Sequence, residues 1–229
     1  MSDHKPHLSP SSIGLFLRCG EAWRRRYVEN EKIPPGIKQI RGSAYHAMAA
    51  VNFRQKINSH SDLLESDLMD LAAEAINNAR RGEWQHDEAT DPKDAWAEAK
   101  DEVVNAASVF ARQVSADYQP ILVEETIKIG LPGASHDAMG ILDMVDDRQR
   151  VTDHKTAQKA KSQQEADASL QLSFYAAAHR ARYGIDPSEV RLDVVTTGGK
   201  RQVLRSTRGY SDFQRLADVV NVMLASIAA

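Results

Sequence analysis

The stretch that most constrains this chain runs from Gly140 to Thr156, with the sequence GILDMVDDRQRVTDHKT. Two short apolar-rich runs flank the polar segment DDRQR, which is the pattern of two antiparallel strands joined by a turn. Because side chains alternate between the two faces of a strand, a turn centred on Arg148 places Asp143 directly opposite Asp153. The Cβ atoms of the two aspartates are then expected to lie about 5 Å apart.

Two carboxylates in such a pair need a compensating charge. At an effective dielectric constant of about 20, two like charges about 4 Å apart repel by about 4 kcal/mol. A proton, a cation or a metal is therefore expected between them. Lys155 lies on the same strand face as Asp153 and supplies one positive charge, and oxygen ligands suit Mg²⁺ and Mn²⁺. The other interpretation is an exposed hairpin with two solvated aspartates and a surface lysine.

Length and composition indicate an ordinary globular protein. The chain has 229 residues, of which 42% are hydrophobic and 27% charged, enough for one well-buried domain or two small ones. No apolar run approaches the roughly 18 residues of a membrane span, and the N-terminus lacks the apolar core of a signal peptide. The single Cys19 excludes an intrachain disulfide. We therefore expect a cytoplasmic protein that does not contact a membrane.

Charge is distributed unevenly along the chain. The formal balance is +6 over residues 1–56, −14 over 57–147 and +6 over 148–208. If the two positive segments adjoin in space, they form a groove for phosphates beside an acidic helical lobe. An uneven distribution of charged residues over solvent-exposed faces, without any binding role, explains the same charge balances.

Periodicity divides the chain into a mainly helical first half and a sheet-containing second half. Ser9 is suited to cap a first helix and Pro10 to begin it. The apolar spacing predicts further helices at about 38–58, 61–81, 92–118 and up to Tyr183, and strands at 121–129, 139–145, 151–156, 190–196 and 202–207. A capping-box pattern at Ser211–Gln214 predicts the start of a final helix.

Several polar residues are candidates for a site, and each has an ordinary structural explanation. His46, among alanines on a helix, is either a metal ligand or a satisfied core histidine. Gln171 and Tyr175 are four residues apart and share a helix face. Such a pair is also common on helices that have no functional site. Of Glu124 and Glu125, which are neighbours in a strand, one is expected to face the site.

Five short motifs, in this order, resemble the PD-(D/E)xK nuclease superfamily and, within it, the RecB-type nuclease domain. The segment LSPSSIGLFLRCGEAWRRRY resembles the family's N-terminal helix, with Cys19 at a cysteine position. The other four segments are RGSAYH, which resembles the Gly-x-x-x-His motif at His46; GILD, which carries the metal-binding aspartate as Asp143; TDHKT, which carries the Asp-x-Lys motif as Asp153 and Lys155; and LQLSFY, which carries the Gln-x-x-x-Tyr motif as Gln171 and Tyr175.

The resemblance implies a fold. It is an α/β restriction-endonuclease-like core, with a central mixed β-sheet flanked by helices and a largely helical N-terminal half. We expect a single nuclease domain over residues 1–229. Residues 1–118 would form its mostly helical part, with an acidic helical insertion at about 61–118, and residues 119–229 its sheet-containing catalytic core.

The resemblance also implies an activity, that of a Mg²⁺- or Mn²⁺-dependent DNA exonuclease in recombination, repair or phage DNA processing. The metal ligands would be His46, Asp143, Asp153 and the backbone carbonyl of His154. Lys155 would orient the attacking water or stabilise negative charge, while Gln171 and Tyr175 would line the cleft and hold Lys155 or its strand. The residues expected to contact DNA are Arg24, Arg25, Arg26, Lys159 and Lys161, although a basic cluster such as 24–26 is also typical of a solvated helix end.

Relatives that hold an iron–sulfur cluster use four cysteines, so with one cysteine we expect no such cluster. The expected partners are single- or double-stranded DNA and a helicase or single-strand annealing protein, in a bacterial or phage-infected cell. Two alternatives stay open: a non-catalytic DNA-binding or assembly subunit that retains the fold, and a metal hydrolase of other phosphate esters.

Overall fold

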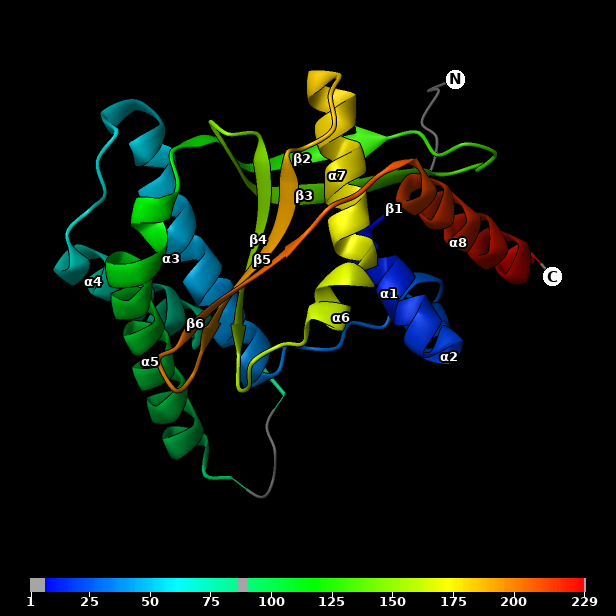
Figure 1. Ribbon diagram of the computed structural model, residues 1–229. Coiled ribbons are helices and arrows are strands. Elements are labelled where there is room, and N and C mark those ends of the chain that lie inside the picture. Colours follow the sequence, from blue (N-terminus) through cyan, green and yellow to red (C-terminus); the bar gives the residue numbers. More distant parts are fainter. Residues whose placement is uncertain (1–6, 86–89, 229) are drawn as a thin grey trace.

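The computed structural model describes residues 7–85 and 90–228, in which a mixed β-sheet lies between two groups of helices (Figure 1). The strands are β1 (His7–Leu8), β2 (Pro120–Ile129), β3 (Asp137–Asp146), β4 (Arg150–Ala157), β5 (Glu189–Thr196) and β6 (Arg201–Ser206). The α-helices are α1 (Pro10–Arg18), α2 (Gly20–Tyr27), α3 (Ile37–Ser59), α4 (Glu65–Ala79), α5 (Pro92–Val109), α6 (Gln163–Asp167), α7 (Leu170–Tyr183) and α8 (Tyr210–Ala228), and α5 continues into a π-helix, η1 (Phe110–Val114), and a 3-10 helix, η2 (Ser115–Asp117). The α/β architecture expected from the sequence is confirmed. No described helix is long and apolar enough to cross a membrane.

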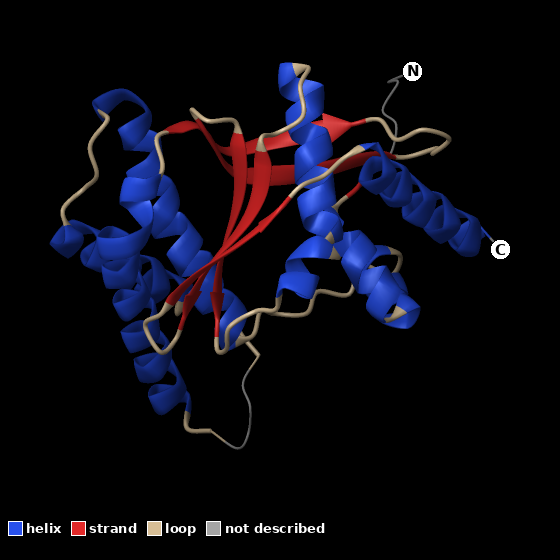
Figure 2. Cartoon of the chain, viewed as in Figure 1, coloured by secondary structure: helices blue, strands red, loops and turns tan. Residues whose placement is uncertain are grey.

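The sheet has the order β1-β3-β4-β5-β6, with β2 on the other edge of β3. Strands β2, β3 and β4 are successively antiparallel, β4 and β5 are parallel, and β6 is antiparallel to β5. Figure 2 shows β2 and β3 running across the direction of β4, β5 and β6, so the sheet bends sharply between β3 and β4.

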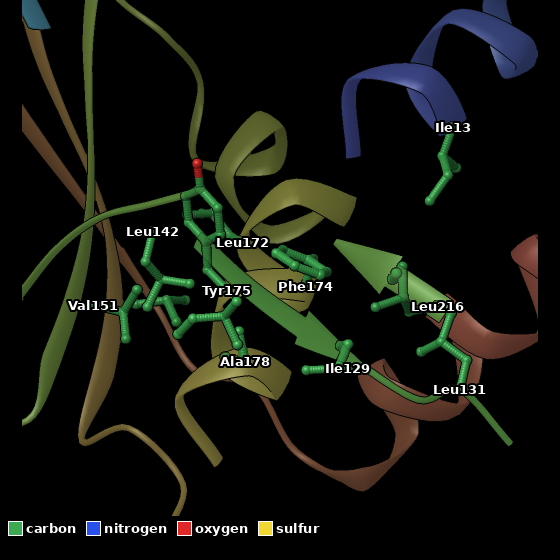
Figure 3. Close-up of a cluster of buried hydrophobic side chains, with 14 of the residues drawn as sticks. Ile13, Ile129, Leu131, Leu142, Val151, Leu172, Phe174, Tyr175, Ala178 and Leu216 are labelled. Atoms are coloured by element: carbon green, nitrogen blue, oxygen red, sulfur yellow. The ribbon is translucent and has the colours of Figure 1, made fainter. Parts of the chain in front are cut away.

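Apolar residues on the two faces of the sheet belong to two separate cores. On one face, Val145 and Val194 pack with α1, α7 and α8, and Figure 3 shows Phe174 and Tyr175 of α7 in this cluster with Leu142 and Val151. On the other face, Met144 and Val195 pack with α3, α4 and α5. Residues adjacent in sequence therefore contribute to opposite cores, as alternation along a strand requires.

One edge of β3 is only partly covered. Strand β2 pairs along one edge from Ala138 to Asp146, so β1 and β4 must share the other. There β1 pairs at Asp137 and Ala138, and β4 pairs only at Met144 and Val145. Among the residues that the structure describes, the segment 139–143 thus has no strand partner on this edge, and the gap gives access to Asp143.

Helix starts follow the sequence signals at one end of the chain but not at the other. The Ser9 side chain caps α1 by accepting from the Ser12 N–H, and Pro10 is its first residue, as expected. The capping box expected at Ser211–Gln214 is wrong by two residues. Helix α8 begins at Tyr210, and the Asp212 carboxylate accepts from the Gly209 N–H instead.

Candidate active site

Asp143 and Asp153 meet where β3 and β4 separate. The paired positions Met144–Thr152 and Val145–Val151 have the register that places Asp143 opposite Asp153, which confirms the predicted turn centre. The next backbone amide of β4, that of His154, donates to Asp143 Oδ2 at 3.1 Å rather than to the backbone of β3. The antiparallel ladder therefore ends at the carboxylates.

The environment of the pair favours its protonated form in the absence of a cation. Asp153 is 2% exposed, and burial, with Asp143 nearby, raises its pKa to about 7 against the opposing effect of Lys155. Burial likewise raises the pKa of Asp143. Burial of two interacting carboxyl groups is the arrangement in which a proton or a cation has to neutralise charge.

Lys155 supplies the nearest positive charge. Its Nζ lies 3.0 Å from Asp153 Oδ1, and its side chain is partly exposed. Burial alone lowers the pKa of Lys155, but Asp153 and Asp143 more than offset this, so the pKa is raised overall. The ammonium group therefore stays charged at neutral pH and is oriented by the carboxylate two residues before it.

His46 reaches the pair from α3, on the other side of the gap. Its Nδ1 lies 3.4 Å from Asp143 Oδ2. Burial and the charge of Lys155 lower the pKa of His46, against smaller opposing effects that include a hydrogen bond to the backbone of His154. The imidazole is therefore neutral at physiological pH, the form that binds metals. The side chain is 27% exposed, so His46 is not a residue of the closed core.

Gln171 and Tyr175 form a chain of hydrogen bonds that ends at Asp143. Gln171 Nε2 donates to the Tyr175 hydroxyl at 2.8 Å, and that hydroxyl donates to Asp143 Oδ1 at 3.4 Å. Both residues also line the cavity beside the site, and the expectation that they hold Lys155 or its strand stays a prediction. Helix α7 packs against both β3 and β4, and its hydrogen bond to the site is made to the carboxylate of β3.

The side chain of His154 points away from the site. Its ring packs against Phe53 at 5.3 Å and Tyr118 at 5.6 Å, on the opposite face of the sheet. Beside it, the Tyr118 hydroxyl donates to the buried Asp193 at 2.7 Å, and Arg201 pairs with the same carboxylate. The side chain of His154 is thus directed away from the site, beside a buried ion-pair network on the opposite face of the sheet. The role of its backbone carbonyl as a metal ligand stays a prediction.

Glu124 and Arg54 adjoin the site, and only the first had a sequence signal. In the β2–β3 register Glu124 falls opposite Asp143, between the pairs Val123–Met144 and Glu125–Leu142. Its φ of 47° lies in the left-handed region, and Arg54 Nη2 donates to its Oε2 at 2.6 Å. Glu125 instead pairs with Arg182 at 3.2 Å on the other side.

A cavity of about 770 Å³ opens beside these residues. It is bounded by α3, by β2 and the open edge of β3, by the N-terminus of α1 and by α7, and His46, Asp143, Gln171 and Tyr175 form part of its wall. Gly42 of α3 lies near this wall, beside β4. The nearest atom to an added Cβ there is Thr156 Oγ1 at 3.8 Å, so packing at that position does not require glycine.

The donor set suits a hard divalent cation. Two aspartates, a neutral imidazole and the backbone of His154 converge at one gap, and the carboxylates lack enough counter-charge in their buried setting. Within residues 7–85 and 90–228, however, no three His, Cys, Asp or Glu side chains are already gathered closely enough to coordinate one ion. His46 and the His154 amide both contact Asp143 Oδ2, so binding would require these contacts to rearrange.

The basic residues expected to contact DNA occupy different environments. Arg24 and Arg25 form exposed ion pairs with Glu21, and Arg24 also pairs with Glu29. Arg26 lies over the Tyr27 ring, with 5.8 Å between its Cζ and the ring centroid. Lys161 pairs with Glu165 at 2.7 Å, and Lys159 is exposed in the segment after β4. The structure does not bring these five residues into the wall of the cavity.

Comparison with known proteins identifies the family and finds solved structures of similar fold. The sequence matches the model of the PD-(D/E)XK nuclease superfamily over residues 7–229. A solved structure from Eubacterium rectale, whose exonuclease name is provisional, has a TM-score of 0.58 at 10% identity and covers 98% of this chain and 80% of its own. The structure of SSO0001 has a TM-score of 0.37 at 14% identity, and the match covers 78% of this chain and 87% of that one. No curated protein matches. The first structure supports the fold.

Proposed function

Since this chain belongs to the PD-(D/E)XK nuclease superfamily, we propose that it is a Mg²⁺- or Mn²⁺-dependent deoxyribonuclease, acting as an exonuclease in DNA recombination, repair or phage DNA processing. The observation that carries this proposal is the meeting of Asp143, Asp153 and Lys155 at the open edge of β3, with His46 facing them from α3. Exonuclease action is proposed because the motif order resembles the RecB-type nuclease domain.

Each residue has a proposed role. His46, Asp143, Asp153 and the carbonyl of His154 would hold the cation, which when bound supplies Lewis acidity and charge neutralisation at the scissile phosphate. Lys155 would orient the attacking water or stabilise the charge that develops on the phosphate oxygens. Its ion pair with Asp153 holds the ammonium beside the carboxylates at 3.0 Å.

Gln171 and Tyr175 are proposed as positioning residues. Tyr175 donates to one oxygen of Asp143 and the His154 amide to the other, so the carboxylate is held from two sides. Donors of this kind fix the orientation of a metal ligand without touching the substrate. We propose that all these residues belong to one nuclease domain that spans the chain.

The test is cleavage of end-labelled single- and double-stranded DNA, linear and circular, with Mg²⁺, Mn²⁺ or EDTA, and with RNA and nucleotide esters in parallel. Cleavage of linear DNA only, dependent on metal, is the expected result, and circular DNA should stay intact. Equal cleavage by Asp153→Ala and wild type would eliminate the assignment. Metal-dependent thermal stabilisation without any cleavage would favour the non-catalytic DNA-binding or assembly subunit.

A further inference from the structure

The cavity beside the candidate site is lined in part by aliphatic and charged side chains that have no role in the proposed cleavage reaction. Val51 of α3 and Ile141 of β3 both contribute to its wall, and they are 40% and 53% exposed. An exposed concave surface that gathers large aliphatic side chains is more often a binding site than ordinary protein surface is. Ile141 is two residues before Asp143 on the same strand face, so this aliphatic wall continues directly from the candidate site.

A positively charged side chain, that of Arg54, also lines this cavity. Arg54 lies eight residues after His46 on α3, about 12 Å along the helix axis at 1.5 Å per residue. Among the residues that the structure describes, the acceptor for its guanidinium is Glu124 Oε2, bound by Nη2 at 2.6 Å. A guanidinium has five N–H donors. The Arg54 guanidinium can therefore stay paired with Glu124 and still donate to a phosphate. About half of the Arg54 side chain is exposed, so a phosphate can reach it.

The size of the cavity limits what fits. A volume of about 770 Å³ is in the range of sites that hold small organic molecules, about 300–1,000 Å³. A DNA duplex, whose major groove alone is about 12 Å wide, is too large to enter such a space. A nucleotide of a single strand, with an apolar base face and an anionic phosphate, matches both the volume and the two kinds of wall.

Resting on the proposed nuclease function, we infer that this cavity holds an unpaired nucleotide of a single-stranded DNA end, next to the scissile phosphate. Its base lies on Val51 and Ile141, and its phosphate is bound by Arg54, which Glu124 orients. Contact with an aliphatic wall reads no base edge, so the cavity accepts any base. The substrate of the site is thus a single strand or a frayed duplex end.

The test measures binding without cleavage, so its outcome does not depend on the nuclease activity. Fluorescence anisotropy in EDTA compares a labelled 20-mer of thymidine with a blunt duplex of the same length, over a range of salt concentrations. We expect the single strand to bind at least tenfold more tightly. Arg54→Gln should weaken its binding about 5–10-fold and reduce the salt slope by about 0.7, the value for one phosphate contact in a single strand.

The aliphatic residues should behave differently from the arginine. Val51→Ser and Ile141→Ser should each weaken binding about 3–10-fold and leave the salt slope unchanged, because they remove apolar contact and no charge. The matched controls are Val222→Ser, at an exposed valine of α8, and Arg180→Gln, which breaks the exposed ion pair with Asp186. Both should bind as wild type does.

Three results would overturn the inference while leaving the proposed nuclease function untouched. They are the absence of single-strand binding by the wild type, equal or tighter binding of the duplex, and affinities for the three cavity variants that match the controls. Conversely, the expected binding pattern in a protein that never cleaves DNA would support the cavity assignment and reject the nuclease.

Discussion

The hydroxyl of Tyr175 donates a hydrogen bond of 3.4 Å to Asp143, across the gap between α7 and the open edge of β3. Gln171 donates in turn to the same hydroxyl. Asp143 also accepts from the His154 amide and contacts His46. One carboxylate therefore joins two strands and two helices, which makes its orientation the most constrained feature of the site.

The first prediction concerns this hydrogen bond. Tyr175→Phe keeps the ring in its core and removes the donor to Asp143. Loss of such a supporting donor typically costs about 10–100-fold in metal affinity or activity, so the variant should need more Mg²⁺ for half-maximal cleavage. Tyr210→Phe is the control, since Tyr210 is 81% exposed on α8. An unchanged metal requirement in Tyr175→Phe would show that the bond does not position Asp143.

The second prediction concerns pH and stability without metal. The pKa of Asp153 is about 7 in the folded chain, against an ordinary value of 3.8, so the folded state holds its proton more tightly. The stability of the wild type therefore falls as pH rises from about 4 to about 7. At about 1.4 kcal/mol per pKa unit, Asp153→Asn should gain up to about 3 kcal/mol more over wild type at pH 8 than at pH 5.

Denaturant unfolding in EDTA at the two pH values measures this difference. The result expected for a buried carboxylate is a stabilised but inactive Asp153→Asn variant at pH 8. The same stability difference at both pH values would mean that Asp153 does not carry a raised pKa.

The third prediction concerns the response of the folded chain to metal. Mg²⁺ or Mn²⁺ should raise the melting temperature at pH 8 and raise it less at pH 6, because protons compete for carboxyl groups whose pKa values are raised. A cation at about 100 times its Kd stabilises by about 2.7 kcal/mol. His46→Ala should reduce the shift at both pH values.

His60→Asn is the matched control for that experiment. His60 caps the end of the same helix with a left-handed φ of 55°, a conformation that asparagine tolerates, and it is exposed. Its shift should equal that of wild type. A normal shift in His46→Ala would remove His46 from the proposed ligands.

The fourth prediction concerns the packing of α7 against β3. An added Cβ at Gly140 would lie 2.6 Å from Phe174 Cε1 and 3.2 Å from Pro10 Cδ. Because Phe174 is fully buried, its ring can shift only by displacing other core residues, and overpacking of this kind costs about 1–3 kcal/mol. Gly140→Ala should therefore unfold at lower denaturant concentration and also lose activity, since Phe174 adjoins Tyr175.

Gly14→Ala provides the comparison on α1. No heavy atom in the described part of the chain lies within 4 Å of an added Cβ at Gly14, and alanine is favoured over glycine in a helix by up to about 1 kcal/mol. This variant should be as stable as wild type or more so. A Gly140→Ala protein as stable as Gly14→Ala would contradict the close packing between α7 and β3.

Local patterns predicted the strands of the site well, because their signals depend on neighbouring residues only. Alternation fixed the faces of Asp143, Asp153 and Lys155, and the turn residues fixed the register. The start of α8 was misplaced for the opposite reason. In sequence Ser211 looks like the N-cap and Gln214 like the third helical residue, whereas in the structure Asp212 is the third residue and accepts from the Gly209 N–H. Which residue becomes the N-cap depends on where the preceding strand ends, and a local pattern does not contain that.

By itself, the sequence determined the family, the α/β architecture and the residues that face one another across the turn at Arg148. Only the tertiary structure decided that β4 leaves β3 after two paired positions, that Tyr175 is hydrogen-bonded to Asp143, and that Arg54 and Glu124 pair beside the cavity. These contacts join elements up to 70 residues apart. Their geometry depends on how a bent sheet packs between two helical layers, and no local periodicity encodes that bend.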